Sequence, residues 1–116
     1  MTKIDRLDGN VEPFAVDSLG TERTVFGDVT QSDNLDDNVN LDYLRGWGIV
    51  GASDLPTKQD FNGSLYTTSA LTTYLYQMGI AEWNINQEYF TNAITNEGGV
   101  LYRAVQDNTG VLPSTD

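Results

Sequence analysis

The chain contains neither cysteine nor histidine. Without cysteine it cannot form disulfide bonds, thiolate nucleophiles or cysteine-ligated metal sites. Without histidine, Ser-His-Asp catalysis, Cys-His catalysis and histidine-ligated zinc are excluded as well. We therefore expect no enzyme of these classes and no cofactor or metal.

Basic residues are also scarce, with six Lys and Arg against 17 Asp and Glu and a formal net charge of −11. Nucleic acids and anionic membrane surfaces are bound through clustered Lys and Arg. We therefore expect neither of them as a partner. A partner with a basic surface is compatible with this charge, and simple solubility accounts for the charge equally well.

Long apolar runs are missing too. Hydrophobic residues make up 39% of the chain, and no stretch approaches the roughly 20 apolar residues of a membrane span. The first part of the chain lacks the continuous apolar core of a secretory signal. We expect a soluble protein made in the cytoplasm, with a modest core that would gain from burial against partner chains.

Residues 1–30 predict an extended docking arm. Their apolar residues are sparse and separated by Gly, Pro, Asp and Thr, and no helical period persists. We expect short strands within the arm, for example over 24–26. Such a segment has no core of its own, so it becomes ordered by lying on another surface, unless it is a disordered terminus. The candidate docking residues are Phe14, Phe26 and, further along, Trp47.

The segment after the arm combines an acidic run with a glycine-rich turn. The acidic residues are Asp33, Asp36, Asp37 and Asp42. Their spacing does not match a calcium-binding EF-hand loop, which needs ligands at alternate positions, a central glycine and a closing glutamate. We therefore predict no metal site. Asn40 can cap a short helix over 41–45 that ends at Gly46, and further glycines then surround Trp47.

Residues 56–79 are the clearest element, and they predict one long helix. Ser53 or Asp54 can cap its N-terminus, and Pro56 suits its first turn. Gly79 suits the left-handed position that often follows a helix C-terminus. Start signals, a stop signal and a helical spacing of apolar residues therefore agree on the same segment.

This helix carries no charge from residue 61 to residue 78. A solvent-exposed helix normally bears charge on its outer face, and threonine is a poor helix former that needs packing for stability. Contact between identical chains is the simplest source of that packing, and packing on the protein's own small domain is the alternative. The candidate interface residues, spaced by three and four, are Phe61, Leu65, Thr68, Leu71, Leu75 and Met78.

Residues 81–116 change to the spacing of short strands and predict a small β module. The turn residues Gly98 and Gly99 favour a hairpin that runs out over 93–96 and back over 100–105. Aromatic rings in this segment could stack on the sugars of a glycan or could form the core of a small sheet. These rings belong to Trp83, Tyr89 and Tyr102. Carboxylates could also form a hydrolytic pair, but a module this small lacks a deep cleft, and we predict no enzyme.

Two combinations of residues point to known modules. The first is made by Asn40, Leu44, Gly46, Trp47, Gly48, Ile49, Pro56, Asp60, Phe61, Asn62, Leu75, Gly79 and Ile80. With them, residues 30–80 resemble the N-terminal region of tail fibre proteins from tailed bacteriophages and prophages. The second is made by Ala81, Trp83, Tyr89, Gly99, Tyr102, Arg103, Ala104 and Pro113. With them, residues 81–116 resemble the small tail-fibre modules that are similar to chitin-binding carbohydrate-binding modules.

The second likeness has one departure. Sugar-binding members of that group carry exposed aromatic residues just after the second strand, where this chain has Val105, Gln106 and Asp107. The departure favours a spacer or structural role for the β module over a glycan site.

The resemblance implies a structural virion protein that attaches a tail fibre to the phage tail or baseplate. It implies a homotrimer, with host recognition further along the polypeptide. The complete expectation is an α+β fold with a docking arm (1–30), a Gly-Trp turn and helical trimerisation region (31–80) and a small antiparallel β module (81–116). The expected partners are other copies of the chain and tail or baseplate proteins, and a host surface glycan is the alternative.

Overall fold

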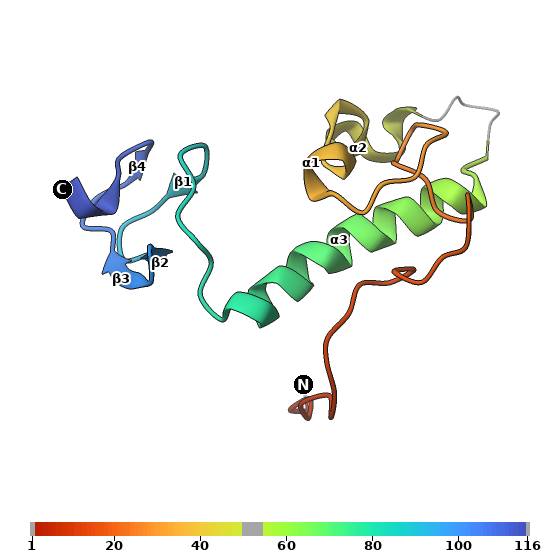
Figure 1. Ribbon diagram of the computed structural model, residues 1–116. Coiled ribbons are helices and arrows are strands. Elements are labelled where there is room, and N and C mark those ends of the chain that lie inside the picture. Colours follow the sequence, from red (N-terminus) through yellow and green to blue (C-terminus); the bar gives the residue numbers. More distant parts are fainter. Residues whose placement is uncertain (1, 50–54, 116) are drawn as a thin grey trace. The chain divides into compact units, whose positions relative to one another are not determined.

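Figure 1 shows the computed structural model, which describes residues 2–49 and 55–115. The predicted α+β class is confirmed, because one long helix is followed by short antiparallel strands. The elements are α1 (Leu35–Asn38), α2 (Leu41–Arg45), η1 (Gly46–Ile49), α3 (Lys58–Met78), β1 (Glu88–Tyr89), β2 (Ile94–Glu97), β3 (Val100–Arg103), β4 (Asn108–Thr109) and η2 (Pro113–Thr115). The chain divides into two compact units, and the division falls within α3, between Thr73 and Tyr74.

The two short helices begin at asparagine caps. The side chain of Asn34 accepts a hydrogen bond from the N–H of Asp36 at the start of α1. The side chain of Asn40 accepts from the N–H of Tyr43 in α2, and Gly46 ends that helix with φ 61°. The predicted helix over 41–45, with its cap and its glycine stop, is confirmed.

The long helix α3 begins two residues later than predicted. The hydroxyl of Thr57 accepts from the N–H of Asp60 at 3.0 Å and so satisfies one of the free donors of the first turn. The predicted caps Ser53 and Asp54 lie outside the described residues. At the other end Gly79 has φ 74° and donates its N–H to the carbonyl of Leu75 at 2.7 Å, as the sequence predicts.

Part of the predicted arm packs on the protein's own helix. Residues 23–26 are all buried, and we call residues 22–33, which lie against α3, the strap (Figure 1). The amide of Asn62 donates to the carbonyl of Glu22 at 2.7 Å, which joins strap and helix. The predicted strand over 24–26 is wrong, since these residues form bends and turns. Among the described residues no strand pairs with them, and the N–H of Val25 instead donates to the carbonyl of Thr30 and closes a local loop.

A buried arginine ties the strap to α3. Arg23 is 1% exposed, and its guanidinium lies 3.6 Å from the centre of the Tyr66 ring, a cation–π arrangement. The same guanidinium pairs with the carboxylate of Asp33, and the hydroxyl of Tyr66 donates to the carbonyl of Asp33 at 2.8 Å. This core is therefore largely polar, and it depends on residues more than 30 positions apart in the sequence.

The β module contains two separate two-stranded antiparallel sheets, β1 with β4 and β2 with β3. The β2–β3 hairpin turns through Gly98 (φ 60°) and Gly99 (φ 86°), two successive positive φ angles that favour glycine. The predicted hairpin is confirmed, although β3 ends at Arg103. Its register sets Thr95 opposite Tyr102, and this pair positions one of the sites described next.

Candidate functional site

One face of α3 is not covered by the residues that the structure describes. We call this face the stripe, and it consists of Phe61, Leu65, Thr68, Leu71, Thr72, Leu75 and Met78. Its five large apolar side chains are between 38% and 50% exposed. Six of the seven residues are the candidate interface residues predicted from the sequence, and Thr72 joins them. They lie together because steps of three and four return to the same side of a helix.

The opposite face of α3 is the buried one. It is made of small or polar residues, namely Gly63, Tyr66, Thr67, Ala70 and Thr73. A helix of a globular protein usually buries its apolar face and exposes its polar face. In this helix the strap contacts the small, polar face at Gly63 and Tyr66, and the apolar stripe remains on the surface.

The threonines of the stripe do not interrupt its apolar character. The hydroxyl of Thr68 donates to the carbonyl of Ser64 at 2.9 Å. The hydroxyl of Thr72 donates to the carbonyl of Thr68 at 3.5 Å. Because these hydroxyls are satisfied within the helix, a partner could cover both residues without leaving a buried hydroxyl unpaired. The stripe can therefore be buried as a continuous surface.

The stripe is also free of charge in a strongly acidic chain. No charged residue occurs between Asp60 and Glu82, whereas the whole chain carries a formal charge of −11. Two copies approaching through most other surfaces would bring carboxylates together, which costs free energy. Through the stripe they would bring together leucine, phenylalanine, methionine and threonine side chains.

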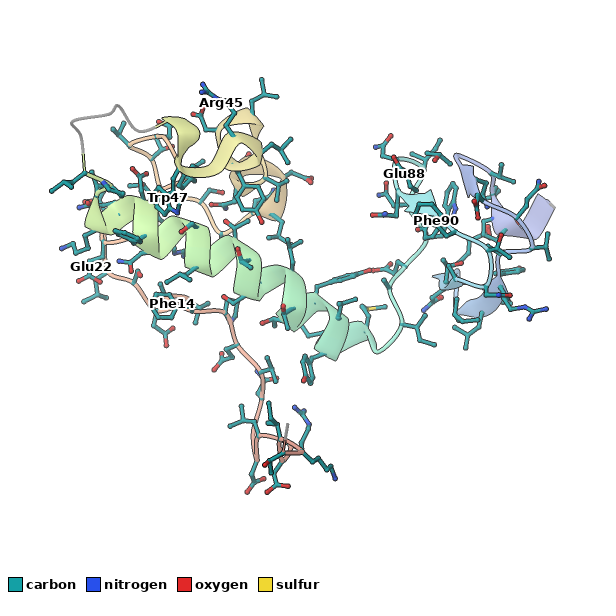
Figure 2. All side chains as sticks on the ribbon, turned by 180° about the vertical axis from the view of Figure 1, so that it is seen from behind. Phe14, Glu22, Arg45, Trp47, Glu88 and Phe90 are labelled. Carbon is teal, nitrogen blue, oxygen red and sulfur yellow. The ribbon has the colours of Figure 1, made fainter. Side chains whose placement is uncertain are left out.

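The three candidate docking residues differ in exposure. Phe14 is 52% exposed, and its N–H donates to the hydroxyl of Ser69 at 2.7 Å, so the arm passes alongside α3 (Figure 2). Phe26 is only 2% exposed and offers no surface to a partner in this conformation. Trp47 is partly exposed and lies between Phe26 and Phe61, with ring centres 4.9 and 5.0 Å away.

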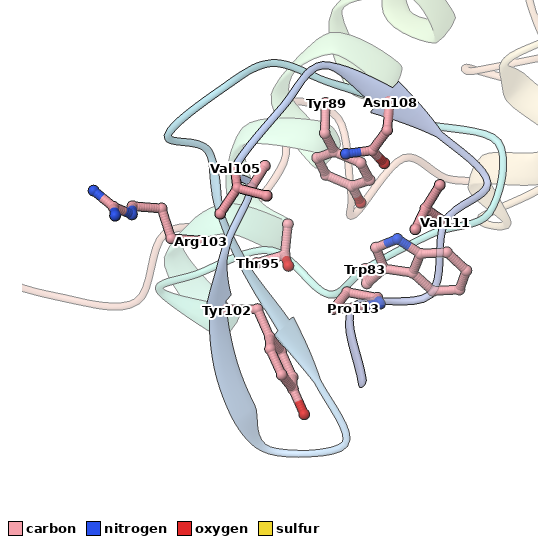
Figure 3. A pocket seen from close by; sticks show the side chains of 10 residues that line it. Trp83, Tyr89, Thr95, Tyr102, Arg103, Val105, Asn108, Val111 and Pro113 are labelled. Carbon is pink, nitrogen blue, oxygen red and sulfur yellow. The ribbon is translucent and has the colours of Figure 1, made fainter. Parts of the chain in front are cut away.

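A second candidate site is a pocket of about 160 Å³ in the β module (Figure 3). The three aromatic residues predicted from the sequence, Trp83, Tyr89 and Tyr102, all line it and are half-buried. The hydroxyl of Tyr89 accepts from the N–H of Asn84 at 2.9 Å, which fixes that ring. The buried indole N–H of Trp83 has no hydrogen-bond partner within the described residues. Sequence reasoning missed Thr95, which faces the pocket because it pairs with Tyr102 across the hairpin.

The residues just after β3 offer no aromatic platform. Val105 is 72% exposed, Gln106 is exposed, and Asp107 closes a turn. The backbone N–H and the hydroxyl of Thr91 both donate to the Asp107 carboxylate, at 2.8 and 2.9 Å. These bonds favour the ionised form, and the backbone bond contributes most to holding the pKa of Asp107 below its ordinary value.

We expect this turn to weaken in acid. A carboxyl group whose pKa is lowered by folding contributes stability above its unfolded pKa of about 3.9, and that contribution is lost as the pH falls through the folded pKa. Because the chain has two tryptophans, Trp83 fluorescence is followed in a Trp47→Phe background. Urea unfolding between about pH 7 and about pH 3 should then show a smaller acid-induced loss of stability with Asp107→Asn than without it. Equal losses would contradict the assignment.

Neither site carries the groups of a metal enzyme. Across residues 2–49 and 55–115, no cluster of three or more His, Cys, Asp or Glu side chains is placed to hold a metal ion. Two carboxylates of the β module are engaged in hydrogen bonds: Glu82 accepts from the hydroxyl of Tyr74, and Glu97 accepts from the hydroxyl of Ser114. None of the described helices is long and apolar enough to cross a membrane.

Comparison with known proteins adds no relative. No family model, no curated protein and no solved structure matches this chain. The choice between functions therefore depends on the two surfaces described above, the stripe on α3 and the aromatic pocket.

Proposed function

We propose that this chain is the N-terminal, tail-proximal part of a bacteriophage tail fibre, a structural virion protein that associates as a homotrimer. The fibre protein would be made in the host cytoplasm and would become part of the virion tail. The observation that carries this proposal is the uncovered stripe of α3. The resemblance proposed for residues 30–80 suggests that the copies associate within a tail fibre.

The geometry of α3 favours association of identical helices. In heptad terms Leu65 and Thr72 occupy a positions, and Phe61, Thr68 and Leu75 occupy d positions. The buried residues of α3 fall at b, c and f positions, which face outward in a bundle, and the strap contacts two of them, Gly63 and Tyr66. Each copy could therefore keep its strap and still present the whole stripe to a common axis.

The energetic gain from such a bundle is considerable. Burying a leucine, methionine or phenylalanine side chain contributes roughly 1.5–3 kcal/mol when the side chain was exposed before. The stripe holds five such side chains that are about half exposed, so each copy would gain several kcal/mol. A protein with so little apolar core of its own benefits strongly from this burial.

Attachment to the tail would use the part of the arm that the helix does not cover. Residues before the strap keep several exposed apolar side chains, including Ile4, Leu7, Phe14 and Leu19. Exposed apolar side chains on a segment without a core are suited to becoming ordered on a partner. The partner would be a tail or baseplate protein, and the acidic composition of this chain favours a basic surface on it.

The first test is the solution mass, measured by light scattering coupled to gel filtration. The proposal expects the mass of about three chains for the native protein. A monomeric mass at every concentration would contradict association through the stripe. Attachment is tested separately with purified tails: deletion of residues 2–20 should abolish binding to tails while the mass stays that of the assembled protein.

A second candidate function, glycan binding, is favoured by the pocket. Three aromatic rings from separate segments converge on one cavity, and aromatic faces are common sugar-binding surfaces. A glycan array should then detect binding that Trp83→Ala abolishes. The matched control is Phe90→Ala, which removes a ring that is 63% exposed and does not line the pocket. Equal binding by both variants, or none by the native protein, would exclude this function.

A further inference from the structure

The stripe continues beyond α3 through an aromatic contact. Phe61, at the N-terminal end of the stripe, touches Trp47 of η1 with the ring centres 5.0 Å apart and the ring planes inclined by 51°. Trp47 in turn meets Phe26 edge to face at 4.9 Å. Exposure rises along this row, from the fully buried Phe26 to the partly exposed Trp47 and Phe61. The indole is thus held by the strap on one side and open on the other.

We infer that Trp47 forms the N-terminal end of the self-association surface and that a second copy of this chain covers its exposed part. The inference rests on the proposed self-association and deepens it. A helix from another copy that covers Phe61 must come within reach of the indole beside it. Tryptophan is enriched among the residues that dominate the binding energy of protein interfaces.

The surroundings of Trp47 favour a copy of the chain over a tail protein as the occupant. The apolar surface is continuous from the indole through Phe61 into the uncharged stripe, so one partner can cover all of it. The nearby guanidinium of Arg45 is bound to the carbonyl of Gly48 at 3.2 Å, which leaves the arginine engaged locally. Trp47 is therefore reassigned from tail docking to contact between copies, and Phe14 remains the candidate docking residue on the arm.

The experiment uses fluorescence, because the chain has only two tryptophans. In the variant Trp83→Phe, Trp47 is the sole tryptophan and can be excited selectively over the tyrosines. On dilution, its emission should shift to longer wavelength and become more accessible to acrylamide over the same concentration range in which the mass falls. If Trp83→Phe fails to fold, the difference between the native protein and Trp47→Phe isolates the same signal. Trp47→Ala should raise the dissociation constant of the assembly about thirtyfold, the loss typical of a dominant interface residue.

The outcomes separate this inference from the proposed function. If the mass falls on dilution while the Trp47 emission stays constant, Trp47 lies outside the shared surface and only this inference is overturned. If the emission changes only when a tail or baseplate protein is added, Trp47 is a docking residue and the inference is again wrong. A monomeric mass at every concentration would overturn both the self-association and the inference.

Discussion

Replacing Leu71 with Asp is expected to convert the assembled protein into monomers while α3 stays folded. Leu71 lies in the stripe and is 41% exposed in the single chain, so the new carboxylate is hydrated in the monomer and costs little there. In an assembly the carboxylate would be buried without a partner, next to copies of itself. Burial of an unpaired charge costs several kcal/mol, so the association constant should fall at least about a hundredfold. Light scattering measures the mass, and circular dichroism measures the helix.

The matched control for this variant is Gln77→Asp. Gln77 is an exposed residue of the same helix, and its position in the heptad is far from the stripe. The substitution adds the same charge six residues away and should leave the mass unchanged. If both variants remain assembled, the stripe is not the surface that joins the copies. If both variants dissociate, the overall charge of the chain, and not the stripe, controls association.

Local signals in the sequence were sufficient for the regular elements. Asn40 and Gly46 delimit α2, and Gly79 ends α3, because capping depends only on residues within one or two turns. The hairpin was equally predictable, since Gly98 and Gly99 suit the tight turn that two strands require. The stripe followed from the same reasoning, since helical spacing determines which residues share a face.

The location of the strap could not be predicted from local pattern. Its contacts join Arg23 to Tyr66 and Asn62 to Glu22, over about 40 positions, and neither pair has a recurring spacing. The sequence did indicate that the arm needs a surface, but the surface turned out to be α3 for residues 23–26. One residue in the sequence does mark a close contact on α3. Gly63 lies inside the helix, where glycine costs about 1 kcal/mol relative to alanine, so its presence indicates that another segment packs there.

The aromatic pocket shows the same limit. Its three rings were identified from composition, because aromatic residues in a short β segment are either core or binding surface. Their convergence depends on the strand register, which sets Thr95 opposite Tyr102. It also depends on the chain returning so that Val111 and Pro113 complete the lining. Of this arrangement, only the hairpin could be predicted from the turn residues.

The substitution Gly63→Ala is expected to destabilise the protein, against the usual effect of this change. In an exposed helix interior, alanine in place of glycine stabilises by about 1 kcal/mol. At this position, however, a Cβ atom would overlap the carbonyl oxygen of Thr24 and come close to the backbone of Phe26. Backbone atoms cannot rotate away, so the strap must shift, at a typical cost of about 1–3 kcal/mol. Urea unfolding followed by circular dichroism should therefore show lower stability than in the native protein.

Displacement of the strap can be followed directly by limited trypsin digestion. Arg23 is buried in the native protein, so cleavage after it requires the strap to leave α3, and Gly63→Ala should accelerate this cleavage. Cleavage after the exposed Arg103 of the β module provides an internal control and should proceed at the native rate. Gln77→Ala, at an exposed position of the same helix, should alter neither rate. A more stable Gly63→Ala protein with unchanged cleavage after Arg23 would mean that the strap does not occupy the space above Gly63, and the polar face of α3 would then be open to a partner as well.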